Sequence, residues 1–542
     1  MAPPGAVDTD KGRDRQPARG RSAAPSGGRR RPPLTLLIPT LVIAAVLLTP
    51  VLYLVLQSRD VGLGSVAPLL WRHLTATLLW NTVSLTVVVT ALCAVIGTLC
   101  AWCTERTDLP GRRIWTVLLV LPFAIPDLVV SFGWATITTW VQGFRGAVLI
   151  MVLTLYPLVF LFVAASLRSS DPGFEETARC LGLGRVATFL RVTVAQCRGA
   201  IVGGSVVVAL LVLAEYGAFE GFGYQTFTME IFSEFNLSFN IPAGCAMTCA
   251  LVLLAVVVLC GDAFFSGAGS VERTGRLAQR ELTRGPLGRA KVPVLGALGL
   301  LIALAVGVPL GSSFYWMFEG GPPTLAGGSI VDAALNTVLY SGVAALVATI
   351  LAVPVALLAT RYRRRSVRIL EVSTFLILAV PGFVVALTVS YFSEHYWGGF
   401  GYQSPPMLVA VYTMLFFPLA LVGVRASAAY VPLRLEEAAR ALGVGRLRAF
   451  FRVTLPLLAP GLATGFCLVF LAAVTELTAT LLLLPAGSQT LATQFWTYEE
   501  NLSYGQAAPY GLVMIAIVAI PAYVLARYFQ RLPARATGLT RR

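Results

Sequence analysis

The sequence is poor in charged residues. Asp, Glu, Lys and Arg make up 12% of the 542 residues, whereas hydrophobic residues make up 57%. A soluble globular chain carries about twice this charged fraction, so the composition argues against a water-soluble enzyme. Apolar runs of about 20 residues recur along the chain, and a helix of that length crosses the ~30 Å hydrocarbon core of a bilayer. The sequence therefore predicts an all-α polytopic membrane protein embedded in a lipid bilayer.

Histidine is nearly absent, which argues against a metal centre. The only histidines are His73 and His395, far apart in the sequence. Cys100 and Cys103 form one CxxC pair, but a structural metal site needs about four ligands. Most of the nine cysteines lie inside apolar runs, where a thiol behaves as a small hydrophobic group, so no disulfide framework is indicated. We therefore expect no metal site and no cofactor.

Lysine is equally rare, and its positions exclude a nucleotide-binding loop. Lys11 and Lys291 are the only lysines, and neither follows a glycine. A phosphate-binding loop needs Gly-Lys-Ser/Thr so that the lysine can reach the phosphates. No Ser-His-Asp arrangement is apparent either. We therefore expect no catalytic residue and no nucleotide-binding loop in this chain.

The apolar runs predict twelve transmembrane helices in two sets of six. The predicted helices span residues 34–57, 76–103, 114–138, 147–167, 200–217, 242–264, 293–314, 334–359, 370–391, 406–426, 460–484 and 507–528. Composition also divides the chain into domains. These are a disordered basic tail at 1–33, a first six-helix domain at 34–264, a cytoplasmic linker at 265–292, a second six-helix domain at 293–528 and a cytoplasmic tail at 529–542.

The net charge of +15 reflects membrane topology. A nucleic-acid-binding protein would need a basic face on a folded soluble domain, and no such domain is visible. The basic residues gather instead in alternate loops and at both ends, while the opposite loops hold only Arg59, Arg72 and Arg145. Lys and Arg accumulate on the cytoplasmic side of membrane proteins, so both termini are predicted to be cytoplasmic.

The two sets of six helices are copies of each other. At an offset of 255 residues, Asn81-Thr82-Val83 matches Asn336-Thr337-Val338 and Arg106 matches Arg361. A matching pattern at a fixed offset indicates a repeat, and an even number of spans in each copy makes the copies parallel. Further pairs match at an offset of 261, among them Pro157 with Pro418, Glu175-Glu176 with Glu436-Glu437, Arg179 with Arg440, Gly182 with Gly443, Arg191-Val192-Thr193 with Arg452-Val453-Thr454, and Glu215 with Glu476.

One polar loop in each copy is long enough to carry a function. Residues 168–199 and 427–459 separate the fourth and fifth helices of their copies, and loops of this length in a compact protein are usually functional. Glu175 stands four residues before Arg179, which favours a short helix, and Gly182 permits a sharp turn after it. We therefore expect each loop to form a helix, a turn and a second helix on the membrane surface, with Glu and Arg exposed to a partner.

A short motif recurs in both loops. The second loop contains Glu437-Ala438-Ala439-Arg440-Ala441-Leu442-Gly443, followed by Val453 and Leu455-Pro456. The first loop contains Glu176-Thr177-Ala178-Arg179-Cys180-Leu181-Gly182, with Thr177 in place of an alanine and Val194-Ala195 in place of Leu-Pro. Both segments resemble the EAA loop in the permease subunits of bacterial ABC importers that depend on a binding protein.

This resemblance implies a fused two-domain permease of the bacterial cell membrane. In that family the loop holds a coupling helix, which fits a groove of the ATP-binding subunit and passes its closure to the membrane helices. We therefore expect two ATP-binding cassette subunits at the cytoplasmic face and a substrate-binding protein outside. The expected coupling-loop residues are Glu175, Glu176, Ala178, Arg179, Gly182, Glu436, Glu437, Ala438, Ala439, Arg440 and Gly443.

Three acidic residues lie in predicted membrane helices, where a charge is costly and often functional. Asp127 follows Pro126, which bends the helix by removing a backbone hydrogen bond, and its repeat partner is Gly382. Glu215 and Glu476 occupy equivalent positions near the outer ends of the fifth and eleventh helices. Either the two glutamates simply reach the outer interface, or they face the central pathway and help to gate a cation or its carrier protein.

A second resemblance concerns the substrate. Residues 476–485, with 489–494 after them, are similar to ferric-iron importer permeases that fuse both halves, and residues 223–228 resemble the corresponding element of the first half. The resemblance implies iron(III), delivered by an extracytoplasmic binding protein. Fused relatives also carry thiamine, phosphonates or polyamines, so these substrates remain alternatives.

A major-facilitator secondary transporter is the alternative from another class, because it also has twelve spans in two parallel halves. Residues 108–113 are similar to one of its loops, but no arginine follows Asp108. This alternative does not predict two long, matched EAA loops.

Overall fold

The computed structural model describes most of the chain. The predicted tail at residues 1–33 and the linker at 265–292 fall mostly outside the described residues. The described residues are 32–60, 73–170, 173–236, 240–265, 285–319, 327–362, 364–399, 401–429, 431 and 433–535.

The regular structure of these residues is helical, apart from one isolated bridge between Thr107 and Gly285. The first copy contains α1 (Leu34–Asp60), α3 (His73–Arg106), α4 (Arg112–Val120), η1 (Leu121–Ala124), α5 (Asp127–Ile137), α6 (Gly143–Ser169), α7 (Gly173–Cys180), α8 (Arg185–Thr188), η2 (Phe189–Thr193), α9 (Val194–Ala214), α10 (Gly217–Glu220), α11 (Phe227–Asn236) and α12 (Ile241–Phe265). The second copy contains η3 (Gly288–Ala290), α13 (Lys291–Ile302), η4 (Ala303–Gly307), α14 (Val308–Glu319), α15 (Gly327–Arg361), α16 (Arg365–Phe375), η5 (Leu376–Ala379), α17 (Gly382–Trp397), α18 (Pro405–Ala428), α19 (Leu433–Ala441), α20 (Arg446–Ala449), η6 (Phe450–Thr454), α21 (Leu455–Val474), α22 (Thr478–Leu483), α23 (Leu491–Glu500) and α24 (Tyr504–Arg535).

The described helices account for the predicted spans. Ten of them are long and apolar enough to cross a membrane. Two further pairs, α4–η1 with α5 and α16–η5 with α17, pass the same test together but are bent by 88° and 104°. Counting each bent pair as one span gives 12 spans. The predicted all-α polytopic fold is confirmed.

Proline marks both bends. Pro126 stands directly before α5, and Pro381 stands directly before α17. Proline has no N–H to donate to the preceding turn, and the residues before the two prolines, Ile125 and Val380, have extended backbone. The predicted bend at Pro126 is therefore confirmed, and the second copy repeats it.

The helices that follow the two polar loops are longer than predicted. We expected a separate second helix in each loop, followed by a span from residue 200 or 460. Instead, one helix runs from Arg185 to Ala214, and its counterpart runs from Arg446 to Val474. Helical hydrogen bonding continues through a π-helical turn in each, formed by η2 and η6. The division into two helices was therefore wrong, as was the end of the eleventh span at residue 484, because the helix stops before Glu476.

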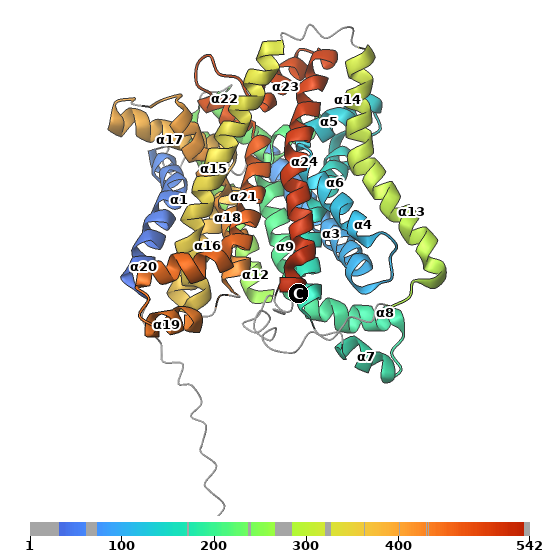
Figure 1. The fold of residues 1–542 in the computed structure, drawn as a ribbon. Helices are drawn as coiled ribbons and strands as arrows, with labels where there is room; N and C mark the ends of the chain where they lie inside the picture. The colour runs from blue at the N-terminus through green and yellow to red at the C-terminus, as the bar shows by residue number, and fades with distance from the viewer. Residues whose placement is uncertain are drawn as a thin grey trace, which may run out of the picture.

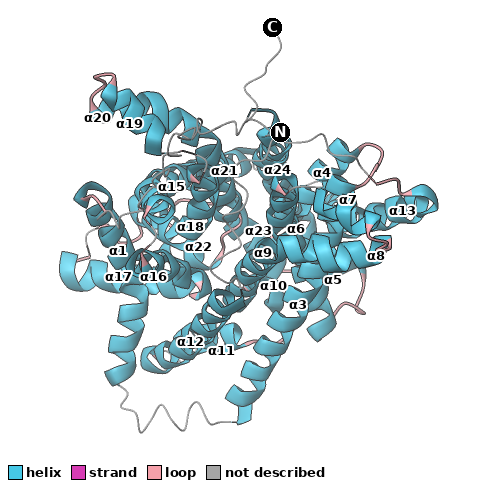
Figure 2. Ribbon diagram, turned by 90° about the horizontal axis from the view of Figure 1, so that it is seen from below, coloured by secondary structure: helices cyan, strands magenta, loops and turns pink. Residues whose placement is uncertain are grey.

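The two copies are interlocked through their first helices. α1 packs on α15, α16 and α17 of the second copy as well as on α12, while α14 packs on α5 of the first copy and on α24. Figure 1 shows α1 beside α17 on one flank and α14 beside α5 on the other, and Figure 2 shows the same grouping of α1 with α16 and α17 from below. Each copy is therefore completed by a helix of the other.

Glycine brings α18 and α21 into backbone contact. A Cβ atom placed on Gly423 would lie 2.4 Å from the backbone nitrogen of Gly465. One placed on Gly461 would lie 2.7 Å from the carbonyl oxygen of Gly423. Membrane helices gain van der Waals contact where small residues let their backbones approach. This crossing therefore requires glycine, which has no side chain, at both positions.

Replacing Gly423 with valine is expected to force α18 and α21 apart. Overpacking costs about 1–3 kcal/mol, and we expect about 3 kcal/mol here because the nearest atoms belong to the backbone and cannot rotate away. Thermal unfolding in detergent should show a Tm lowered by several degrees. The control is Gly299→Ala in α13, where an added Cβ meets no atom within 4 Å. Equal losses of Tm in the two variants would contradict the packing argument.

Candidate functional site

The two predicted loops lie at the same end of the molecule. Figure 1 shows α7 of the first loop and α19 of the second at its lower end, opposite α22 and α23. Two parallel copies require this arrangement, since equivalent loops of parallel repeats emerge on the same side. One face of the molecule therefore carries both loops.

Each loop begins with a short helix that glycine ends. In α7, Glu175 and Glu176 occupy the first turn and Arg179 the last, an order that suits the helix dipole. Gly182 and Gly443 adopt φ angles of +85° and +83°. The hydrogen bonds of a Schellman motif then close both helices, from the glycine N–H to the arginine carbonyl at 3.0 Å and from the next N–H to the alanine carbonyl five residues earlier at 3.1 Å.

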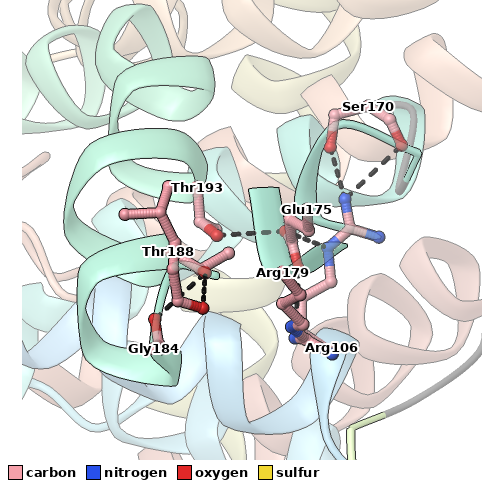
Figure 3. A network of polar contacts seen from close by, with 8 residues as sticks. Arg106, Ser170, Glu175, Arg179, Gly184, Thr188 and Thr193 are labelled. Atoms are coloured by element: carbon pink, nitrogen blue, oxygen red, sulfur yellow. Dashed lines mark hydrogen bonds and ion pairs between the residues drawn. The ribbon is translucent and has the colours of Figure 1, made fainter. Parts of the chain in front are cut away.

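Glu175 is the centre of a buried polar network (Figure 3). Its Oε1 atom lies 3.2 Å from Arg106 Nε and accepts a hydrogen bond from the Thr193 hydroxyl at 3.0 Å. Arg106 also donates to Ser170 Oγ at 2.6 Å, and Arg179 Nη2 lies 3.9 Å from Glu175 Oε2. The Arg106 and Glu175 side chains are only 4% and 7% exposed. A buried ion pair thus ties α7 to the end of α3 and to η2.

The second copy repeats this network. Arg361 Nη2 lies 3.0 Å from Glu436 Oε2, and the Thr454 hydroxyl donates to the same oxygen at 3.4 Å. Arg361 ends α15 as Arg106 ends α3. The Arg361 and Glu436 side chains are 10% and 15% exposed, so this second ion pair is also largely buried. Both loops are therefore held by the same three kinds of residue.

The predicted loop residues divide by exposure. We expected the glutamates to face a partner, but Glu175 and Glu436 point inward to an arginine of their own chain. The 8 residues of α7 and the 9 of α19 are too few for periodicity to show which of two adjacent glutamates is buried. Of the predicted set, Glu175 and Ala178 are buried, Glu176, Glu436 and Ala439 are half-buried, and Arg179, Gly182, Glu437, Ala438, Arg440 and Gly443 are exposed.

Exposed apolar side chains surround both loops at matching positions. Leu181 and Leu442, one residue before the turn glycines, are 79% and 85% exposed. Large apolar groups exposed together mark a protein–protein or membrane interaction site. We call these two sets the docking patches, and their members are Phe174, Leu181, Val186 and Leu190 in the first loop and Leu435, Leu442, Leu447 and Phe451 in the second.

Comparison with known proteins identifies the family. The sequence matches the family described as the binding-protein-dependent transport system inner membrane component over residues 93–266 and again over residues 348–537. The chain belongs to this family. Each match contains one polar loop, and the starts of the two matches, 93 and 348, differ by the 255 residues of the internal repeat. The resemblance drawn from the EAA loops is confirmed.

Individual relatives include ferric-iron permeases. The Fe(3+)-transport system permease protein FbpB 2 of Haemophilus influenzae is 34% identical over 502 residues, which cover 92% of this chain and 99% of that protein. The ferric transport system permease protein FbpB of Actinobacillus pleuropneumoniae is 23% identical over 78% of this chain and 67% of that protein. The sulfate transport system permease protein CysW of Escherichia coli is 25% identical over 41% of this chain and 83% of that protein.

The chain is therefore an inner-membrane permease of an ABC importer with two permease domains. This family membership sets the major-facilitator alternative aside. The homologous permeases are membrane subunits rather than enzymes.

Glu215 directly follows α9 of the permease, and Glu476 lies two residues after the end of α21. The Glu215 carboxylate accepts the N–H of Ala218 at 3.0 Å, and the Glu476 carboxylate accepts the N–H of Ala479 at 3.0 Å. Each glutamate side chain therefore accepts an N–H from the first turn of the short helix that follows it, α10 or α22. Both residues are half-buried.

The three acidic residues predicted in the membrane helices lie near one another in the structure. Glu215 interacts electrostatically with both Asp127 and Glu476. A Cβ atom placed on Gly382, the repeat partner of Asp127, would lie 2.6 Å from Glu476 Oε1, so the equivalent position in the second copy also lies beside a glutamate. No group of three His, Cys, Asp or Glu residues in the described part of the chain could hold a metal ion. The three carboxyl groups therefore lie near one another where the two copies meet.

Some residues of the loops were missing from the predicted site. Arg106, Arg361, Thr193 and Thr454 were matched by the repeat, but their contacts with the glutamates were not predicted. An arginine at the end of an apolar run, repeated at the same offset as an acidic loop residue, is the signal that could have found the pair. The docking patches carry no such signal, because leucine is unremarkable in a membrane protein.

Removing Arg106 is expected to loosen the first loop. Arg106→Ala leaves the Glu175 carboxylate buried without its cation, and losses of this kind cost about 3–5 kcal/mol. Adding Glu175→Gln removes the stranded charge and should recover much of the stability. Thermal unfolding of both single variants and the double variant measures this coupling. A double variant no more stable than Arg106→Ala would refute the ion pair as the main restraint.

Proposed function

We propose that this permease forms the translocation pathway of the importer and couples ATP hydrolysis on separate subunits to substrate uptake. The observation that carries the proposal is the pair of matched loops at one end of the molecule, each held to a membrane helix by a buried Arg–Glu pair. The binding-protein-dependent family supports it, because such systems use an ATPase and a substrate-binding protein.

Each loop has the properties of a docking site. A stable interface places apolar groups at its centre and polar groups around them. In the second loop, Leu442 would supply the centre, with Glu437 and Arg440 exposed beside it. Two loops on one face suit two ATP-binding cassette subunits, one on each loop.

The buried ion pairs would pass motion from these subunits to the membrane. Glu175 contacts Arg106 at the end of α3 and Thr193 in η2, and η2 continues into α9. A displacement of α7 therefore acts on two membrane helices at once. Packed, hydrogen-bonded elements of this kind transmit displacement because they cannot deform freely.

The same charge pattern orients the permease. We place both termini, the linker at residues 265–292 and both loops on the cytoplasmic side, because the basic residues gather there. Residues 34–264 and 293–528 would then be the two permease domains, with 1–33 and 529–542 as cytoplasmic tails.

Alanine at Gly443 is expected to uncouple the second loop. A residue with a Cβ costs about 1–2 kcal/mol in the left-handed region, so α19 should lose its Schellman closure and present Leu442 in a different direction. We expect the permease-stimulated ATPase rate to fall about tenfold or more, with Gly182→Ala acting similarly in the first loop. Gly111→Ala is the control, since Gly111 has a φ of +66° but lies outside both loops. Equal stimulation in Gly443→Ala and Gly111→Ala would count against the docking role.

We propose iron(III) as the substrate, delivered by an extracytoplasmic binding protein that docks on the outer loops. The relative covered over almost its full length is an Fe(3+) permease by name. Asp127, Glu215 and Glu476 place three carboxyl groups where the copies meet, and oxygen ligands suit hard cations. Thiamine, phosphonates and polyamines remain alternatives.

Neutralising Glu215 and Glu476 together tests the pathway proposal. Gln keeps an oxygen that accepts the Ala218 and Ala479 N–H groups, so Glu215→Gln with Glu476→Gln removes the carboxyl groups and preserves these hydrogen bonds. We expect uptake of labelled ferric iron by whole cells to fall about tenfold or more, with the protein level unchanged. Glu394→Gln in α17 is the control, since Glu394 is exposed. If the double variant took up iron as fast as the wild type, the two glutamates would have no role in the pathway. If the wild type took up no iron, iron(III) would be refuted as the substrate.

A further inference from the structure

The end of the linker forms a strap on the first loop. We define the strap as residues Gly285–Lys291. Gly285 pairs with the end of α3 as a short parallel bridge: its N–H donates to the Arg106 carbonyl at 3.1 Å, and its carbonyl accepts the Asp108 N–H at 3.2 Å. The strap is therefore bonded to the backbone of Arg106, whose side chain holds Glu175.

Asp108 fixes the middle of the strap. Its Oδ1 atom accepts the N–H of Leu287 at 2.7 Å, and its Oδ2 atom lies 3.7 Å from Lys291 Nζ. The hydrogen bond from Leu287 and the nearby Lys291 ammonium hold the pKa of this carboxyl below its usual range. Asp108 is therefore ionised at neutral pH, and the Leu287 side chain is 8% exposed.

The strap also contacts the first loop directly. Arg185 Nη1 donates to the carbonyl oxygen of Pro286 at 3.1 Å. A Cβ atom placed on Gly285 would lie 3.7 Å from Arg179 Nη2, so the Arg179 guanidinium lies against the strap. Two arginines of the first loop, one on each side of the Gly182 turn, thus rest on the same segment.

The position equivalent to Asp108 in the second copy is not an aspartate. The residue 255 positions after Asp108 is Arg363, and a guanidinium cannot accept a backbone N–H. Two residues of the first loop are also more deeply buried than their counterparts in the second loop. Glu175 and Ala178 are buried, whereas their counterparts Glu436 and Ala439 are half-buried. The two loops share their ion pairs but differ in burial and in the residue at the position of Asp108.

The strap continues into the first helix of the second copy. Lys291 is the first residue of α13, which leads through η4 into α14, and α14 packs on α5 and α24. The first loop is thereby connected to a helix that lies between the two copies.

We propose that the strap is a positioning element that holds the first loop in its docking geometry before an ATPase subunit binds, so that the two loops of the permease are inequivalent. The docking role of the loops rests on the function proposed above, but the bracing itself does not. An ordered loop loses less conformational entropy on binding, so the first loop is the more strongly preformed of the two sites. Asp108 acts through Leu287 and Lys291 and is a positioning residue.

Hydrogen exchange of the purified full-length permease, without an ATPase, tests the bracing. The probes are the N–H groups that close the two turns, at Gly182 and Leu183 and at Gly443 and Val444. We expect the first pair to exchange about tenfold more slowly. Asp108→Ala should remove that difference by speeding the first pair. Asp108→Asn keeps an acceptor for the Leu287 N–H and should retain most of the protection. The matched control is Arg363→Ala, which should leave both pairs unchanged.

A second measurement covers the possibility that Asp108→Ala is poorly folded. A carbodiimide joins a carboxylate to an amine by an amide bond, with the lost water taken up as the urea. In the wild-type chain it should link Asp108 to Lys291, detected by mass spectrometry, and the linked protein should keep the slow exchange of Gly182 and Leu183. Equal exchange of the two loops in the wild type, or equal acceleration of both by Asp108→Ala, would overturn the proposal, as would the absence of the link.

The experiments distinguish failure of the bracing by the strap from failure of the docking function proposed for the loops. If Asp108→Ala speeds exchange in the first loop but ATPase binding and stimulation are unchanged, the strap stands and the docking function falls. If Gly182→Ala and Gly443→Ala reduce stimulation while Asp108→Ala changes no exchange rate, the docking function stands and the strap falls.

Discussion

The geometry of the loop face depends on one interaction, the buried ion pair between an arginine at the end of a membrane helix and a glutamate in the following loop. A charge removed from water is stable only with a partner and further hydrogen bonds. Glu175 finds both in Arg106 and Thr193, and Glu436 finds both in Arg361 and Thr454. The short helices α7 and α19 could not hold a fixed position by their own stability, because helices of this length are marginal in water. The ion pair fixes the position of the short helix, and the turn glycine sets the direction of the chain after it. The exposed leucine is the group that would contact a partner.

Duplication explains why the permease has two such loops, and divergence explains why they are not the same. The arginine, glutamate, threonine and glycine of the loop are retained in both copies. The changes lie beside them: aspartate in one copy stands where arginine stands in the other at Asp108 and Arg363, and aspartate stands opposite glycine at Asp127 and Gly382. Both changes put an extra acidic residue in the first copy. Fusion into one chain lets each copy vary in this way, because the two halves always meet in the same order.

Much of the fold could be predicted because it depends on length and repetition. Runs of apolar residues long enough for a bilayer gave the helices, proline gave the bend at Pro126, and the fixed offset gave the two loops. The exchange of α1 and α14 between copies could not be predicted, since the apolar surface of a membrane helix looks the same whether it meets lipid or protein. The inward direction of Glu175 was missed because the adjacent Glu176 is chemically identical. The continuation of α8 into α9 was missed because a π-helical turn has no sequence signature.

Those π-helical turns have a geometric consequence. A regular α-helix advances about 100° per residue, and a π-helical turn holds one residue more than an α-helical turn. The turns at Phe189–Thr193 and Phe450–Thr454 therefore determine how every later residue of the same helix is rotated about the helix axis. Glu215 and Glu476 stand at the far ends of these helices, and regular α-helices in place of the π turns would aim both carboxylates about 100° away from their present directions. The directions of the Glu215 and Glu476 side chains are therefore set at the opposite end of the molecule, within the loops that hold the docking patches.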